Sequence, residues 1–186
     1  MKIIKNFFIF IACIFLLFVC TACEKGYISN KAEIIQDFSA NKNLFERCAN
    51  ELLDSDSFAW QNSIAIALNE DKVTVKSLKD ISDFWIVYEE FDSYATKALL
   101  QRSKTKRIIK RGHCIYFVEF SFGMGSTTGA GICYVQTGNI KQLPEYRKEM
   151  KFQVFDEGYL GEMSGSDNYL YFEELSENFY FYEYGD

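Results

Sequence analysis

The chain has 186 residues and a formal net charge of −6, with six cysteines, one histidine and one proline. All 26 acidic residues follow residue 23, so residues 24–186 alone carry a net charge of −8. Such an acidic chain argues against nucleic acid as a partner, because proteins that bind it need positive potential to displace its counterions.

The first 22 residues have the composition of a targeting segment. Lys2 and Lys5 form a basic head, and residues 7–20 contain no charged side chain. Thr21 and Ala22 then place two small residues before Cys23. A basic head, an apolar stretch and a small-residue cleavage site are typical of a secretory signal, which is removed and takes no part in the fold.

Small residues directly before Cys23 resemble the signal peptides of bacterial lipoproteins, although Cys20 stands where that family usually has an aliphatic residue. The resemblance implies cleavage after Ala22 and a lipid anchor on the Cys23 thiol. We therefore expect a signal peptide over 1–22, a short lipidated tether over 23–29, and a protein anchored on the extracytoplasmic face of the cell membrane or outer membrane. The alternative is an uncleaved anchor, but residues 7–22 supply 16 apolar or small residues against the roughly 20 that span a bilayer.

The next segment predicts a long amphipathic helix over 31–53. Asn30 can cap this helix, and Glu33 can complete a capping box. An apolar stripe at helical spacing follows: Ile34, Ile35, Phe38, Phe45, Cys48, Leu52 and Leu53. We expect this stripe to pack on a sheet.

Two apolar runs, 63–68 and 73–76, flank a polar turn and predict a β-hairpin. Residues 79–101 are ambiguous. Apolar side chains recur in steps of three and four from Ile81 to Leu99, which favours a helix over 80–101, whereas the run 84–88 has strand propensity. Of the two, we expect the helix.

The rest of the chain predicts antiparallel strands. We expect strands over 107–110, 113–122 and 132–136, a less regular section over 138–165, and a closing hairpin of 168–174 and 179–184. Residues 30–186 are then a single α+β domain, with the N-terminal helix packed on a mostly antiparallel sheet of about seven strands.

Few enzyme templates fit this inventory of residues. His113 is the single histidine and no Cys-x-x-Cys pair occurs, so we expect neither a metal site nor a cofactor. His113 and Cys114 are consecutive on a predicted strand and point to opposite faces, so a cysteine–histidine pair would need Cys48 or Cys133. The glycine-rich run 123–131 lacks the lysine and the following helix of a phosphate loop, and we interpret it as a hairpin.

Six basic residues gather between positions 102 and 111: Arg102, Lys104, Lys106, Arg107, Lys110 and Arg111. Our first interpretation is a solvated loop and edge strand, since lysines also deter edge-to-edge aggregation. The functional alternative is a docking patch for an acidic partner or for lipid headgroups.

The closing hairpin is the predicted binding surface. Tyr180, Tyr182 and Tyr184 share one face of the last strand, and Phe179 and Phe181 share the other. With phenylalanine in and tyrosine out, the three tyrosines would present a ladder suited to a protein or glycan partner. The alternative is that the tyrosines only roof the core.

A disulfide between Cys114 and Cys133 is predicted from strand register. A two-residue turn at Gly123-Met124 pairs residues whose numbers sum to 247, which sets Cys114 opposite Cys133. Directly opposed residues lie close enough for a bond, and exported proteins meet oxidising conditions. A turn at Ser126-Thr127 would instead leave two buried thiols.

These features together predict a membrane-tethered, extracytoplasmic lipoprotein that is a non-enzymatic binding or accessory protein. Two alternatives stay open. One is a small hydrolase of envelope material that uses a pair of carboxyl groups, and the other is an immunity or inhibitor protein against a basic toxin or enzyme. A polar cleft with converging carboxylates of raised pKa would favour the hydrolase.

Overall fold

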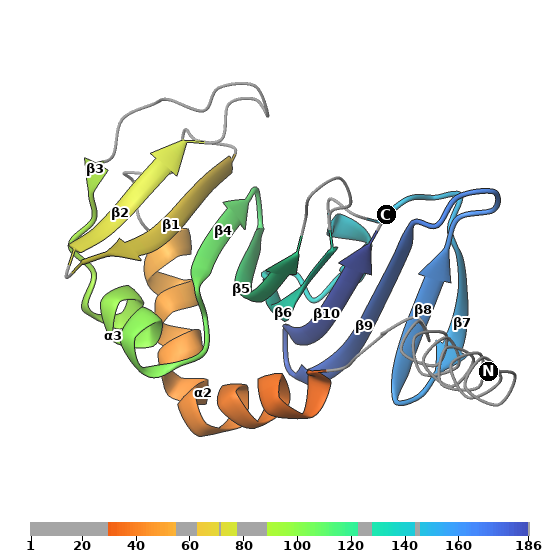
Figure 1. The fold of residues 1–186 in the computed structure, drawn as a ribbon, viewed down its shortest axis with the longest axis horizontal. Helices are drawn as coiled ribbons and strands as arrows, with labels where there is room; N and C mark the ends of the chain where they lie inside the picture. Colours follow the sequence, from red (N-terminus) through yellow and green to blue (C-terminus); the bar gives the residue numbers. More distant parts are fainter. Residues whose placement is uncertain are drawn as a thin grey trace, which may run out of the picture.

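One strongly curved antiparallel sheet organises the molecule (Figure 1). The structure is a computed structural model that describes residues 30–54, 63–70, 72–77, 89–122, 128–143 and 146–185. Its ten strands follow the order β3-β2-β1-β4-β5-β6-β10-β9-β8-β7. The predicted α+β class is confirmed, and the predicted count of about seven strands is too low.

The first half of the described chain contributes α2 (Lys31–Asp54), β1 (Ser63–Asn69), β2 (Lys72–Ser77), β3 (Glu89–Glu90) and α3 (Tyr94–Arg102). The second half contributes β4 (Arg107–Arg111), β5 (Cys114–Phe122), β6 (Thr128–Val135), the short 3-10 helix η2 (Ile140–Gln142), β7 (Lys151–Phe155), β8 (Gly158–Glu162), β9 (Tyr169–Ser176) and β10 (Phe179–Gly185). The predicted first helix, the hairpin β1–β2 and the hairpin β9–β10 are confirmed.

Two predicted segments are corrected. The helix expected over 80–101 begins only at Tyr94, because Ser93 caps it by accepting a hydrogen bond from the Thr96 N–H at 3.0 Å. Glu89–Glu90 is instead a strand that pairs with β2, while residues 78–88 lie outside the described part of the chain. The section expected to be irregular contains the hairpin β7–β8.

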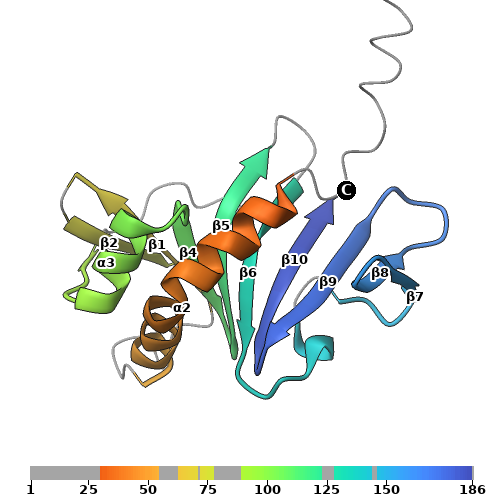
Figure 2. The same ribbon diagram turned by 90° about the horizontal axis from the view of Figure 1, so that it is seen from below.

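The long helix α2 crosses one face of the sheet diagonally (Figure 2). Most of its predicted apolar stripe is buried, and Ile35 and Leu53 are partly buried. The ring centroids of Phe45 and Phe117 of β5 are 4.9 Å apart, and those of Phe38 and Phe179 of β10 are 5.2 Å apart. Glu33, which was predicted to complete a capping box, has its Oε2 atom bonded to Lys104 Nζ at 2.6 Å.

The opposite face of the sheet carries a second apolar cluster. Tyr116 of β5 and Tyr182 of β10 meet edge to face at 5.2 Å between ring centroids. Leu143, Tyr146 and Phe152, from the chain between β6 and β8, pack against this cluster. The central strands are therefore apolar on both faces, unlike a sheet with one face in water.

This second cluster overturns the predicted tyrosine ladder. Tyr180 and Tyr182 are 7% and 1% exposed, and Tyr184 is partly buried with its ring stacked on Tyr182. Phenylalanine and tyrosine do alternate between the faces of β10, but the tyrosine face is covered. The prediction failed because alternation shows which residues share a face and does not show whether another segment covers that face.

We expect Tyr182→Ser to destabilise the fold by about 3–5 kcal/mol, the range for truncating a large buried aromatic residue. Urea unfolding of the full-length protein measures the change. The matched control is Tyr94→Ser at a 65% exposed position, which should cost no more than about 1 kcal/mol. Equal small effects for both variants would contradict the buried placement of Tyr182.

Candidate functional site

A cavity of about 310 Å³ opens between the N-terminal end of α2, the linker from α3 to β4, and β5. Figure 2 shows the start of α2 close to the end of β5. The described residues that line the cavity are Asn30, Glu33, Ile34, Lys104, Lys106 and Glu119. The cavity thus combines two carboxyl groups and two ammonium groups over one aliphatic side chain.

Glu119 enters this cavity from an irregularity in the sheet. Along β5, Val118 pairs with Gly131 of β6, but the next pair is Phe120 with Ala130. Glu119 is therefore the extra residue of a β-bulge and has no partner in the register with β6. Bulges of this kind re-aim side chains and are frequent beside functional sites.

Gly131 makes this bulge possible. A Cβ atom at position 131 would lie 2.1 Å from the Phe117 carbonyl oxygen and 3.2 Å from the Glu119 nitrogen. Only a residue without a side chain allows β5 to pass so close. The glycine-rich run 123–131 is thus connected with the site through Gly131, which lies within β6.

The Glu119 carboxyl group is buried without compensation. The residue is 5% exposed, and neither carboxyl oxygen has a hydrogen-bond partner among the described residues. Burial raises the pKa of Glu119 to about 8; the nearby Asp37 charge adds to this rise, and Lys104 opposes it. A buried polar group without a partner is rare in folded proteins and costs free energy, so it points to a function.

The charges around Glu119 are largely paired with one another. Lys104 Nζ lies 2.6 Å from Glu33 Oε2, and this contact lowers the pKa of Glu33 and raises that of Lys104. Asp37 accepts from the Lys104 backbone N–H at 2.9 Å and from the Asn41 side chain at 3.0 Å. Each carboxylate oxygen of Asp37 thus accepts a hydrogen bond from within the protein.

Lys106 differs from Lys104. It lines the cavity, and its backbone N–H donates to the Val118 carbonyl oxygen at 2.9 Å, which fixes it beside the bulge. No ion pair of the described residues involves Lys106. The cavity therefore holds an ammonium group and a carboxyl group that do not pair with each other.

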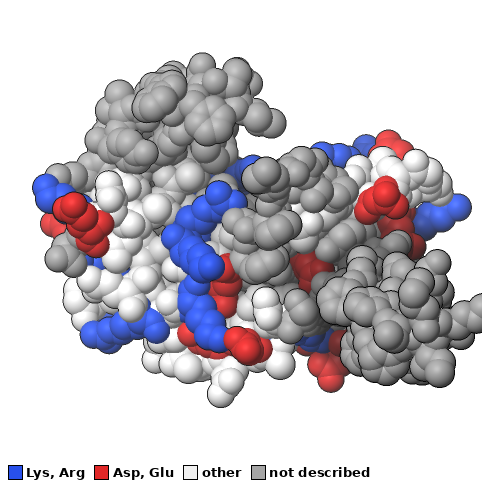
Figure 3. All heavy atoms as spheres, in the orientation of Figure 1, with Lys and Arg blue, Asp and Glu red and all other residues white. Residues whose placement is uncertain are grey.

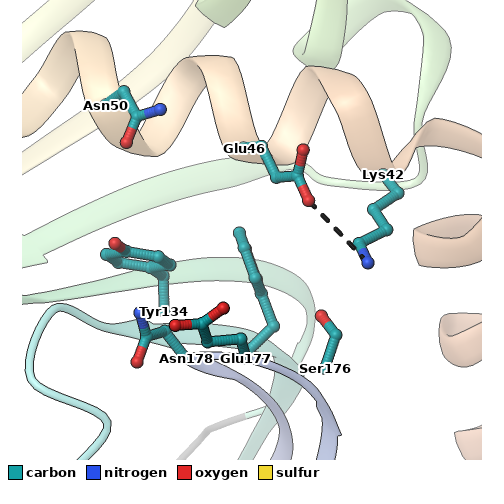
Figure 4. A pocket seen from close by; sticks show the side chains of 8 residues that line it. Lys42, Glu46, Asn50, Tyr134, Ser176, Glu177 and Asn178 are labelled. Atoms are coloured by element: carbon teal, nitrogen blue, oxygen red, sulfur yellow. Dashed lines mark ion pairs between the residues drawn. The ribbon is translucent and has the colours of Figure 1, made fainter.

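A second cavity, of about 350 Å³, lies between α2 and the turn that joins β9 to β10. Figure 4 shows Lys42 and Glu46 on one side of it and Ser176, Glu177 and Asn178 on the other. The ion pair of Lys42 and Glu46 is loose at 3.8 Å, and both side chains are about half exposed. The Ser176 hydroxyl has no partner among the described residues, but no charged group is buried here. This cavity is the weaker candidate.

A third cluster of charge, around Lys31, is fully compensated. Lys31 Nζ lies 2.5 Å from both Asp156 and Glu173 and 3.3 Å from the Tyr171 hydroxyl. Burial lowers the pKa of Lys31, but these hydrogen bonds outweigh it and the pKa is raised. The cluster fastens the start of α2 to β9 and to the β7–β8 turn. It leaves no group for a ligand.

The structure contradicts the register on which the predicted disulfide rested. Cys114 pairs with Val135, and Tyr116 pairs with Cys133, two positions away from the expected alignment. The turn at Gly123-Met124 lies outside the described residues, and the observed pairs from Cys114 to Val118 sum to 249. Cys114 and Cys133 are buried thiols on the same side of the sheet. Cys48 of α2 is also a buried thiol, in the cluster on the opposite side.

The other predicted site residues do not form a reactive centre. His113 is exposed, with its Nδ1 atom 2.9 Å from Gln136 Oε1. Cys48 is fully buried, and burial raises its pKa to about 12, the opposite of what a nucleophilic thiol needs. Cys23 lies outside the described residues.

The fold places the basic residues of 102–111 in different surroundings. Figure 3 shows a column of Lys and Arg side chains over β4 on the face turned to the viewer. Lys110 is not part of a solvated surface, because it is 6% exposed and its Nζ donates to the Leu52 carbonyl oxygen at 2.9 Å. Lys104 and Lys106 line the cavity at Glu119. The run therefore contributes to a cavity and to the end of α2, as well as to the surface.

Sequence reasoning missed Glu119. It stands in an apolar strand, where the pattern Phe117-Val118-Glu119-Phe120 places one charge among large apolar residues. That charge, on the strand face that carries Ile115 and Phe117, was the available signal. Within the described parts of the chain, no cluster of histidine, cysteine and acidic side chains could hold a metal ion. Neither described helix is long and apolar enough to cross a membrane.

Comparison of the chain with models of protein families, with curated proteins and with solved structures finds no match.

We expect Glu119→Gln to change how stability depends on pH. The folded-state pKa of Glu119 lies above its ordinary value of 4.5, so the unfolded chain binds fewer protons between pH 4.5 and about 8. Across that window the native protein loses stability as pH rises, by about 1.4 kcal/mol for each unit. Glutamine does not titrate, so the stability of the variant relative to the native protein should increase as pH rises.

Urea unfolding at pH 5 and pH 8 measures this difference. The two proteins should be similarly stable at pH 5, and Glu119→Gln should be the more stable at pH 8. Glu162→Gln, at an exposed position on β8, is the control and should follow the native protein. If Glu119→Gln instead had the same pH dependence of stability as the native protein, burial would not penalise the charged form of the Glu119 carboxyl group.

Proposed function

We propose that this protein is a lipid-anchored, extracytoplasmic lipoprotein that binds a small polar ligand in the cavity at Glu119 and performs no chemistry on it. The main support for the proposal is that the Glu119 carboxyl group is buried in a cavity and has no hydrogen-bond partner among the described residues. A ligand that supplies a hydrogen-bonding or charged group would compensate the cost of that burial.

The proposed anchor suits the position of the cavity. Asn30, which lines the cavity, is the seventh residue after Cys23. Seven residues span at most about 25 Å of extended chain. If Cys23 is lipidated, the cavity is held close to the membrane surface. The net charge of −8 disfavours adhesion to anionic lipid, so acyl chains would hold the protein there.

Binding is favoured over catalysis by the surroundings of Glu119. A hydrolase of the acid-pair type needs a second carboxyl group that reaches the substrate. Asp37 is near enough to raise the pKa of Glu119, which is the specific observation in favour of a hydrolase. However, Asp37 does not line the cavity, and its oxygens are bonded to the Lys104 backbone and the Asn41 side chain. Glu33 does line the cavity, but its carboxylate is paired with Lys104 at 2.6 Å, which lowers its pKa, so it is poorly suited to act as an acid beside Glu119.

Non-denaturing mass spectrometry of the full-length protein, released from membranes in mild detergent, tests the proposal. The native protein should have the mass of residues 23–186 plus acyl groups, together with a small molecule that leaves on collisional activation. Cys23→Ser should keep the mass of the uncut, unacylated chain. Glu119→Leu should be acylated but lack the small molecule.

Acylation of Cys23→Ser would refute the anchor. A small molecule retained equally by Glu119→Leu, or its absence from the native protein, would refute binding at the cavity. The exposed variant Glu162→Gln is the control and should match the native protein in both respects.

A further inference from the structure

Glu119 and Lys106 have opposite charge types, and both line the cavity. No ion pair within 4.0 Å links Glu119 to Lys104 or to Lys106 among the described residues. Lys104 is already neutralised by Glu33 at 2.6 Å. This leaves the buried Glu119 and the exposed Lys106, neither of which has an ion-pair partner among the described residues.

The fold fixes the backbone at both of these residues. The backbone of Glu119 is held by the bulge against Gly131, and the backbone N–H of Lys106 donates to the Val118 carbonyl oxygen at 2.9 Å. A molecule with two separated charges can therefore bridge them without any change in the backbone. A carboxyl group that can ionise and an ammonium group, each on a fixed backbone, favour a ligand of complementary charge pattern.

We propose, building on the binding function above, that the ligand is a small zwitterion whose primary ammonium group binds Glu119 and whose anionic group binds Lys106. The ammonium donates to the carboxylate oxygens that lack partners, and Ile34 supplies an apolar wall for the short carbon chain between the charges. The cavity volume of about 310 Å³ admits a molecule of the size of an amino acid or of phosphoethanolamine.

Binding of an ammonium group should release a proton from the protein. The carboxyl group of Glu119, whose pKa is about 8, is mostly neutral at pH 7 and becomes a carboxylate when it pairs with the ammonium. The other charged groups that face it are Glu33 and Asp37 from α2 and Lys104 and Lys106 from the linker. The ion pair of Glu33 and Lys104 favours the charged forms of both groups, so neither should supply the proton.

Isothermal titration calorimetry of the full-length protein in detergent tests the proposal with four probes. Alanine is a zwitterion with a carboxylate, and phosphoethanolamine is a zwitterion with a phosphate. Comparing the two distinguishes a free amino acid from a phospholipid headgroup as the ligand. Ethylamine has only the cation, and phosphocholine lacks N–H donors. Two buffers without primary amines and with different ionisation enthalpies give the number of protons released.

We expect at least one zwitterion to bind at least tenfold more tightly than ethylamine or phosphocholine, with release of close to one proton at pH 7. Glu119→Gln should weaken that binding about thirtyfold or more, the usual effect of removing one partner of a buried charge pair. Lys106→Gln should bring the affinity of the zwitterion down to that of ethylamine. Glu162→Gln should change nothing.

Failure of both zwitterions to bind, or binding that Glu119→Gln leaves intact, would overturn the inference, as would ethylamine binding as tightly as either zwitterion. Glu119→Gln is expected to fold, so a loss of binding with unchanged circular dichroism is informative. If the small molecule seen by mass spectrometry depends on Glu119 while neither zwitterion binds, the binding function stands and the ligand class is wrong.

Discussion

The close passage of β5 over Gly131 is the constraint on which the site depends. With 2.1 Å between a Cβ position at Gly131 and the Phe117 carbonyl oxygen, no other residue fits there without displacing backbone. The close approach accommodates the bulge, and the bulge leaves Glu119 out of the β5–β6 ladder. From there its carboxyl group enters the space under the start of α2. Packing on both faces of the sheet then excludes water from the strands around it, which is why the charged form is costly.

Much of the fold follows from local patterns in the sequence. The stripe from Ile34 to Leu52 specifies α2 and its buried face, and two polar turns specify the hairpins β1–β2 and β9–β10. The helix before β4 was predicted too long because its apolar spacing extends back beyond the cap at Ser93. The hairpin β7–β8 was missed although its strands are joined by a two-residue turn at Asp156 and Glu157, because the strands are short and mostly polar or exposed.

The site was beyond prediction from one sequence for physical reasons. Whether Tyr182 is exposed depends on the chain between β6 and β8, which covers its face, and no local pattern shows that contact. The Cys114–Cys133 pairing failed because the register depends on a turn whose type the glycine-rich sequence leaves open. Glu119 shows its lack of a partner only once α2 and the linker at Lys104 are in place. The sequence did indicate basic residues in that linker, but not that two of them line a cavity.

The binding proposal depends on a Glu119 carboxyl group that is buried and has no hydrogen-bond partner among the described residues. Carbon-detected NMR of the Glu119 carboxyl carbon in the full-length protein, followed as a function of pH, tests this most directly. We expect a titration midpoint near 8, well above the ordinary 4.5, and a lower midpoint when a saturating zwitterion is present. A midpoint near 4.5 without ligand would contradict it, because the carboxylate would then be solvated or already paired.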